Sequence, residues 1–138
     1  MEAFLPLSEL LILARKLYAC RHTGVVVPYK MVDSSHREFG CHQNAGMWAR
    51  DNPGCKVVHG WLVFDHEKTS RGLVPLVNFN PHSIIEGDDG DRYDVTPSHA
   101  SQRYPFLDHE GDADDFIRIV QDNSLAILSY NTLTDRLA

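Results

Sequence analysis

Hydrophobic residues near the N-terminus recur three and four positions apart, which is the spacing of one face of an α-helix. This stripe consists of Leu10, Leu11, Leu13, Ala14 and Leu17. Ser8 is a suitable N-cap, because its hydroxyl can accept a hydrogen bond from a free amide of the first turn. We therefore predict a helix from Ser8 to about Cys20.

A second helix is predicted to start at Gly40-Cys41 and to end near Asn52-Pro53-Gly54, since proline followed by glycine is a strong stop signal. Between the two helices lies a short β-branched run at residues 25–27 that stops at a proline. Residues 29–40 are polar and irregular, which predicts a loop.

The periodicity changes after the second helix. Residues 56–65 and 73–79 have the alternation and β-branched content of strands. Residues 82–86 and 92–96 flank the polar turn 87–91, a pattern typical of a β-hairpin with a longer loop.

Acidic residues at positions 112–115 suit the start of a third helix, which runs through Phe116, Ile117 and Val120. Residues 124–130 fit either a strand or a short helix. Helices followed by an antiparallel sheet and a final helical addition predict an α+β fold, with residues 1–138 forming one domain.

The composition narrows the classes of partner. The chain has 138 residues and a formal net charge of −6, so it lacks the basic excess that neutralises phosphates or anionic lipid headgroups. We therefore expect neither nucleic acid nor membrane as a partner. The longest apolar stretch, residues 10–14, is far shorter than the ~20 residues of a membrane-spanning helix.

The cysteines indicate a reducing compartment. Cys20, Cys41 and Cys55 are odd in number and do not form a disulfide framework. The N-terminus has no basic start before its apolar run, so we expect no secretory signal and a cytoplasmic location. Cys20, at the end of an apolar helix, is expected in the core.

The strongest chemical signal is Cys41. A cysteine in the first turn of a helix lies at the positive end of the helix dipole, which stabilises a thiolate by about 0.3–1 kcal/mol. The thiolate is the nucleophilic form of the side chain. Because this gain is less than one pKa unit, a nearby imidazolium must supply the rest.

His82 is the best candidate for that imidazole. If the hairpin turn is centred on Asp89, Ile84 lies opposite Asp94, and His82 and Asp94 are diagonal neighbours on one face, roughly 7–8 Å apart between Cα atoms. A two-residue change of register would place them directly opposite each other. In either case Asp94 can orient one imidazole nitrogen while the other faces Cys41, as in a nucleophile–base–acid triad.

Four short motifs follow one another in this part of the chain: Cys41-His42-Gln43-Asn44, Val58-His59-Gly60-Trp61, Asn80-Pro81-His82-Ser83 and Tyr93-Asp94-Val95-Thr96-Pro97. In this order they resemble small bacterial and phage proteins that have a Cys-x-x-Asn helix start, a Gly-Trp strand, a His-led strand and an Asp-x-Thr-Pro strand. Those proteins are similar to compact papain-like thiol hydrolases. The resemblance implies a cysteine-bearing helix packed on an antiparallel sheet that carries the histidine and the aspartate.

The resemblance also implies roles for individual residues. Cys41 would be the nucleophile, His82 the general base and Asp94 its orienting partner, while Asn44 would brace the site one turn after Cys41. No glutamine precedes Cys41, so the oxyanion would bind the Cys41 amide and a second donor, with Ser35 and His36 as candidates. We expect a thiol hydrolase or acyl transferase, similar to peptidases, that acts on a peptide or amide-containing substrate without a cofactor.

Two residues of the Gly-Trp strand have alternative interpretations. Trp61 and His59 share a strand face, so both could contact substrate beside the proposed site. Core packing is the favoured interpretation of Trp61. Three other histidines fall in loop-like stretches, where we expect them to be exposed: His66, His99 and His109.

A competing hypothesis is a non-catalytic binding or interaction domain on the same scaffold, with or without zinc. Its metal ligands would be Cys41, His42, Cys55 and His59. Adjacent helix residues point about 100° apart, which disfavours Cys41 and His42 as a ligand pair. We therefore expect no metal.

Overall fold

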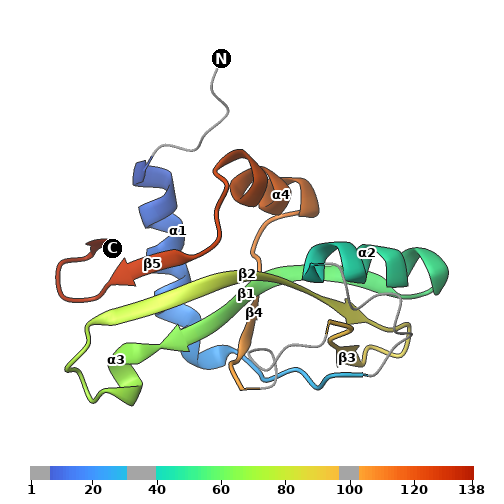
Figure 1. Ribbon diagram of the computed structural model, residues 1–138, viewed down its shortest axis with the longest axis horizontal. Coiled ribbons are helices and arrows are strands. Elements are labelled where there is room, and N and C mark those ends of the chain that lie inside the picture. The colour runs from blue at the N-terminus through green and yellow to red at the C-terminus, as the bar shows by residue number, and fades with distance from the viewer. Residues whose placement is uncertain (1–6, 31–39, 97–102) are drawn as a thin grey trace.

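The computed structural model describes residues 7–30, 40–96 and 103–138, and it has an α+β fold. Its elements alternate between helices and antiparallel strands (Figure 1). In chain order they are α1 (Leu7–Cys20), η1 (Arg21–Thr23), α2 (Cys41–Asp51), β1 (Lys56–Asp65), α3 (His66–Thr69), β2 (Leu76–Glu86), β3 (Arg92–Tyr93), β4 (Phe106–Asp108), α4 (Ala113–Asp122), β5 (Leu128–Asn131) and β6 (Arg136–Leu137).

A long antiparallel pair of strands, β1 and β2, forms the centre of the sheet. Their register runs from Lys56 opposite Glu86 to Asp65 opposite Val77. The strand order is β4-β1-β2-β5-β6, and the short β3 also pairs with β2. Along the edge of β2 that faces away from β1, β5 pairs with Leu76–Phe79 and β3 pairs with Ile85 and Glu86. Among the described residues, no strand covers the stretch of this edge between them.

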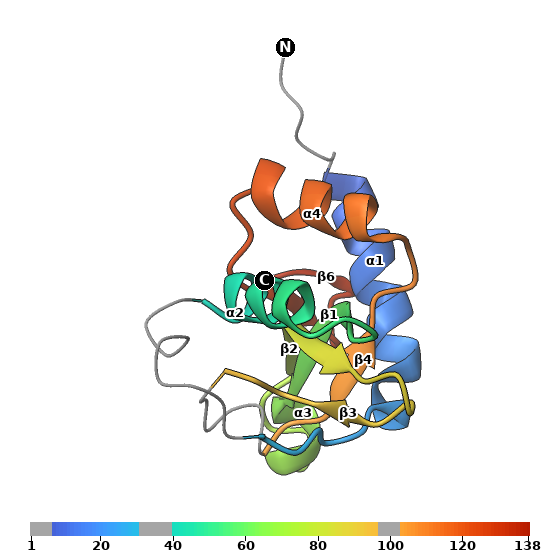
Figure 2. The ribbon, with the colours of Figure 1, turned by 90° about the vertical axis from the view of Figure 1, so that its right-hand side faces the viewer.

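The two faces of the β1–β2 pair are covered differently. Odd-numbered residues of both strands, such as Trp61 and Phe79, pack in the core with α1 and α4, and Ile85 packs with α2. Even-numbered residues such as Leu62 and Ile84 pack against Val27 and Phe106. Figure 1 shows α2 and α4 above the sheet and the extended segment after α1 below it, and Figure 2 shows the same arrangement from the side.

The edge strand β4 lies very close to β1. Gly60 lies opposite Asp108, and a Cβ atom at position 60 would overlap the carbonyl oxygen of Leu107. Glycine is therefore required at position 60 by this close approach of two backbones.

Several sequence-based predictions about the fold are confirmed. The first two helices, the strand over residues 56–65 and the helix after Asp112 all form, and Asp112 caps α4 by accepting a hydrogen bond from the Asp115 amide at 2.8 Å. The hairpin has the predicted register, with Ile85 opposite Tyr93. The first helix starts at Leu7, one residue before the predicted cap Ser8.

Other predictions about the fold were wrong. In place of separate strands over 73–79 and 82–86, Leu76–Glu86 form one continuous strand that runs through Pro81. A residue without an amide hydrogen is tolerated there because no strand of the described residues pairs with this stretch of the outer edge of β2. The second hairpin strand stops at Tyr93 instead of residue 96. Of the two alternatives for residues 124–130, the strand is the one that forms, over Leu128–Asn131. Three short elements, α3, β4 and β6, were not predicted.

Two further findings concern exposure and membranes. Cys20, expected in the core, is exposed, because it lies on the solvent side of the last turn of α1. Within residues 7–30, 40–96 and 103–138, no helix has the length and hydrophobicity needed to cross a bilayer.

Candidate active site

Cys41 is the first residue of α2. The N-cap, Gly40, has an extended backbone with φ −69° and ψ 164°, and it has no side chain that could cap the amides of the first turn. The thiol therefore lies at the positive end of the helix without a competing carboxylate or hydroxyl from the cap. Its residue is partly exposed, so a small molecule in solvent can reach it.

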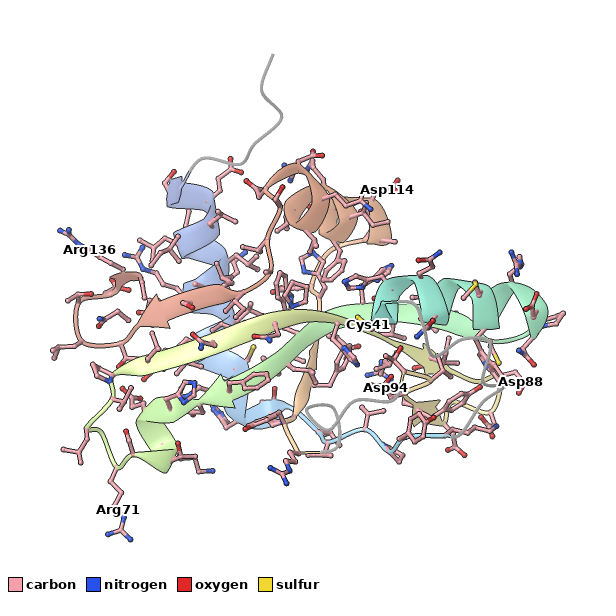
Figure 3. The ribbon with its side chains drawn as sticks, viewed as in Figure 1. Cys41, Arg71, Asp88, Asp94, Asp114 and Arg136 are labelled. Carbon is pink, nitrogen blue, oxygen red and sulfur yellow. The ribbon has the colours of Figure 1, made fainter. Side chains whose placement is uncertain are left out.

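His82 and Asp94 are brought together by β2 and β3. Because Ile85 pairs with Tyr93, the residues on either side of this pair face the opposite side of the sheet. Nε2 of His82 is hydrogen-bonded to Oδ2 of Asp94, and both residues are buried. This contact leaves Nδ1 of His82 available to Cys41. Figure 3 shows Cys41 at the start of α2, with Asp94 near it in this view.

The main chain on both sides of Asp94 holds the carboxylate in place. The amide of Asp94 donates to the Pro28 carbonyl at 2.8 Å, and its carbonyl accepts from the Lys30 amide at 2.9 Å. Oδ1 accepts a hydrogen bond from the Thr96 amide at 2.9 Å. Since Oδ1 is occupied in this way, Oδ2 faces His82 in a fixed orientation.

The pKa of Cys41 lies below that of His82, which reverses the usual order of a thiol and an imidazole. Burial disfavours the thiolate, but hydrogen bonds from His42 and His82 outweigh it and lower the pKa of Cys41 to about 6. Burial also disfavours the imidazolium, but hydrogen bonds to Asp94 and Cys41 outweigh it and raise the pKa of His82 to about 9. Between these values the proton resides on His82, and Cys41 is a thiolate.

A second histidine approaches Cys41 from the other side of the sheet edge. Nδ1 of His42 lies 2.5 Å from Oγ of Ser83, and Nδ1 of His59 lies 2.7 Å from the same oxygen. A serine hydroxyl can donate one hydrogen bond and accept another, so it can join two neutral imidazoles. Burial, followed by the charges of His42 and His109, lowers the pKa of His59 and favours its neutral form.

The start of α2 therefore lies across the outer edge of β2, on the stretch between the residues that pair with β5 and those that pair with β3. Consecutive residues of the helix, Cys41 and His42, face consecutive residues of the strand, His82 and Ser83. Since neighbouring strand residues point to opposite faces, the thiolate has one histidine on each side. Sequence reasoning did not find the part played by His42 and Ser83, because only tertiary structure places Ser83 beside a residue of α2.

Asn44 links α2 to the aspartate. It lies one turn after Cys41 and is fully buried. Its Nδ2 donates to Oγ1 of Thr96 at 3.1 Å, and the Thr96 amide in turn donates to Asp94. This arrangement is compatible with the expected bracing role of Asn44.

The proposed substrate residues have different surroundings. Trp61 is fully buried in the core, as the packing interpretation expected, and its indole donates to Nδ1 of His109 at 3.3 Å. His59 is half-buried and stacks on Phe116 with ring centroids 4.8 Å apart. His109, expected to be exposed, is instead 4% exposed, because it also bonds to Asp115 at 2.8 Å.

Other proposed residues cannot be placed in the site. Ser35, His36 and His99 lie outside the described residues. Within the described ranges, no three histidine, cysteine or acidic side chains are grouped so that they could hold a metal ion. Cys55 lies 3.6 Å from the hydroxyl of Tyr93 rather than beside Cys41.

Comparison of the chain with protein-family models, with curated proteins and with solved structures finds no match in any of the three.

Proposed function

We propose that this protein is a thiol-dependent hydrolase or acyl transferase that acts on amide or related acyl bonds. The single observation that carries the proposal is the continuous series Cys41–His82–Asp94, in which a helix-start thiol, an imidazole and a buried carboxylate are linked by hydrogen bonds. Nucleophile, proton carrier and orienting acid are the three parts that acyl transfer by a thiol requires.

The chemical steps follow from the lowered pKa of Cys41 and the raised pKa of His82. The Cys41 sulfur attacks the carbonyl carbon, and the carbonyl π electrons move to oxygen. As the intermediate collapses, the C–N bond breaks and His82 donates its proton to the leaving amine. Water or an acceptor amine, which gives a proton to His82, then attacks the thioester carbon. The C–S bond breaks as this second intermediate collapses, which releases the acyl product and restores the Cys41 thiolate beside protonated His82. Asp94 acts as a positioning residue that holds Nε2–H of His82.

The likeness to papain-like enzymes supports a narrower version of the proposal. The chain has a cysteine-led helix on an antiparallel sheet, with the histidine on β2 and the aspartate directly after its neighbouring strand β3. We propose a papain-like fold and a peptide or amide-containing substrate on this basis. Three free cysteines fit a reducing compartment such as the cytoplasm.

The proposal is tested by the pH dependence of Cys41 alkylation by iodoacetamide, in a Cys20→Ser, Cys55→Ser background. Only the thiolate reacts, so the rate should rise with a midpoint near pH 6, rather than near the roughly 8.5 of an ordinary thiol. The midpoint is the better readout than the rate, because a thiolate of lower pKa is also a weaker nucleophile.

His82→Ala should raise this midpoint by at least about one pH unit, because the thiolate loses its cationic partner. His22→Ala is the matched control, since His22 is exposed and should leave the midpoint unchanged. A midpoint near 8.5 in the unaltered protein would refute the hydrolase proposal and leave a non-catalytic binding domain as the remaining candidate.

A further inference from the structure

A groove runs beside Cys41 between the two helices that cover the same face of the sheet. It has a volume of about 440 Å³, which lies within the usual range for small-ligand sites. α2 forms one wall, α4 forms the other and β1 forms the floor (Figures 1 and 2). The lining residues are His42, Gln43, Gly46, Val57, His59, Phe116, Ile117, Val120 and Gln121.

The polarity of the groove changes along its length. The end near Cys41 contains the imidazoles of His42 and His59, which both contact Ser83. One turn further along α2 the lining is mostly apolar, with Val57 on the floor and Ile117 and Val120 on the opposite wall, where Gln121 is the polar exception. An amphipathic ligand therefore fits in one orientation, with its polar group next to the thiol.

Gly46 keeps the α2 wall open. Glycine in the middle of a helix costs roughly 0.5–1 kcal/mol relative to alanine, and it is usually explained by close packing. The described part of the chain provides no such packing, since a Cβ atom at position 46 would have none of its atoms within 4 Å. The missing side chain instead leaves space in the groove. Ile117, across the groove, is 38% exposed and lacks an apolar cover in the described structure.

We infer that the groove between α2 and α4 binds an apolar acyl group, with its carbonyl carbon held at the His42 end next to the Cys41 sulfur. This inference deepens the proposed function and rests on it. It assigns the acyl side of the substrate to a chain or side chain of aliphatic or aromatic character. Cys41 itself does not line the groove, but its neighbour His42 does. The larger cavities, of about 980 and 630 Å³, are lined neither by His42 nor by His59.

The test uses a series of N-alkylmaleimides from N-ethyl to N-octyl, which add irreversibly to the thiolate without any turnover. Sulfur bonds to one alkene carbon, and water supplies the proton to the other. In the Cys20→Ser, Cys55→Ser background, the rate at Cys41 should rise tenfold or more along the series, because each buried methylene contributes a factor of up to about four.

Gly46→Leu should abolish this dependence on chain length, because the added side chain fills the groove. Ile117→Ser should also reduce the dependence of the rate on chain length, because it removes an apolar contact on the opposite wall of the groove. Ile12→Ser is the matched control, because Ile12 is an exposed isoleucine of α1 outside the groove, and it should change nothing. Thermal unfolding of each variant verifies that it is folded.

Two outcomes would overturn the inference: a rate independent of chain length in the unaltered protein, or a full dependence in Gly46→Leu. Neither outcome moves the pH midpoint of alkylation. Conversely, an ordinary midpoint with a steep chain-length dependence would refute the hydrolase proposal and retain the apolar site. The two failures are therefore distinguishable.

Discussion

The imidazoles of His82 and His42, which both contact Cys41, differ in the groups to which they are hydrogen-bonded. His82 is buried and bonded to a buried carboxylate, whose other oxygen is held by a main-chain amide. His42 is bonded to a hydroxyl that it shares with His59. A carboxylate stabilises the positive form of its imidazole, whereas a hydroxyl serves two neutral imidazoles equally well.

This difference indicates that the two histidines have different roles at the Cys41 sulfur. The His82 side can hold and deliver a proton, because its cation is neutralised by Asp94. The His42 side supplies a hydrogen bond to the thiolate and adjoins the groove. Under the proposed function, the thiolate exchanges protons with His82 on one face of the sheet, and the substrate binds in the groove beside His42 on the other face.

The largest effect is expected from Asp94→Asn. Oδ1 of Asp94 accepts from the Thr96 amide and Oδ2 bonds to His82, so an asparagine can satisfy only one of the two. If its NH₂ group faces His82, the imidazole takes the wrong tautomer for proton transfer. Turnover of an activated amide should fall by about 10²- to 10⁴-fold with an unchanged KM.

Asp88→Asn, an exposed turn residue, is the control for loss of a carboxylate. Near-normal turnover in Asp94→Asn would mean that the carboxylate does not distinguish the two histidines.

Phe116→Ala should remove the ring that packs against His42 and His59, the two histidines that share the Ser83 hydroxyl. The ring is 1% exposed, stacks on His59 and meets His42 edge-on with centroids 5.6 Å apart. Loss of a buried phenylalanine costs about 3–5 kcal/mol, measurable as a lower midpoint in urea unfolding. The exposed neighbour Ile117→Ala should cost less than about 1 kcal/mol. Equal losses would show that Phe116 is not a core residue.

Ser83→Ala should affect Cys41 less than His82→Ala does. The substitution removes the shared hydroxyl but leaves the carboxylate-backed histidine in place. The midpoint of Cys41 alkylation should rise by less than about one pH unit. Ser129→Ala, on β5, is the control. A shift as large as that of His82→Ala would abolish the proposed asymmetry between the two sides.

If the triad turns over a substrate, the pH profile should be a bell. Protonation of the Cys41 thiolate removes activity below about pH 6. Loss of the His82 proton removes it above about pH 9. In Ser83→Ala the acidic limb should move slightly upward while the basic limb stays in place, which separates the two histidines in one measurement.

The smallest effect is expected from Gly46→Ala. The added methyl group has space on all sides, and alanine is the better helix former, so unfolding free energy should rise by about 0.5–1 kcal/mol. The pH midpoint should not change, because position 46 faces the groove rather than the sulfur. A loss of stability would mean that the glycine has a packing role after all.

The sequence was informative where local rules decide the structure. The Gly-Asp-rich turn set the hairpin register, and that register correctly placed His82 and Asp94 on one face. The N-terminal position of Cys41 on its helix followed from Gly40 and the later stop signal. Both features depend on residues that are close together in the chain.

Long-range features could not be predicted in the same way. The approach of Ser83 to His42 spans 41 residues of chain and depends on how α2 crosses the sheet edge. Pro81 was taken as a break, although the unpaired edge allows a proline within the strand. His109 was expected in solvent because a loop pattern does not reveal that Trp61 and Asp115 enclose it.

The matching of two consecutive helix residues with two consecutive strand residues has a consequence for folding. A slip of β2 by a single residue would exchange the faces of His82 and Ser83 and present a hydroxyl where the sulfur needs a cation. The protein could then fold to a compact structure and still lack a reactive thiolate. The pKa of the Cys41 thiol would thus report whether β2 has paired with its neighbouring strands in the correct register.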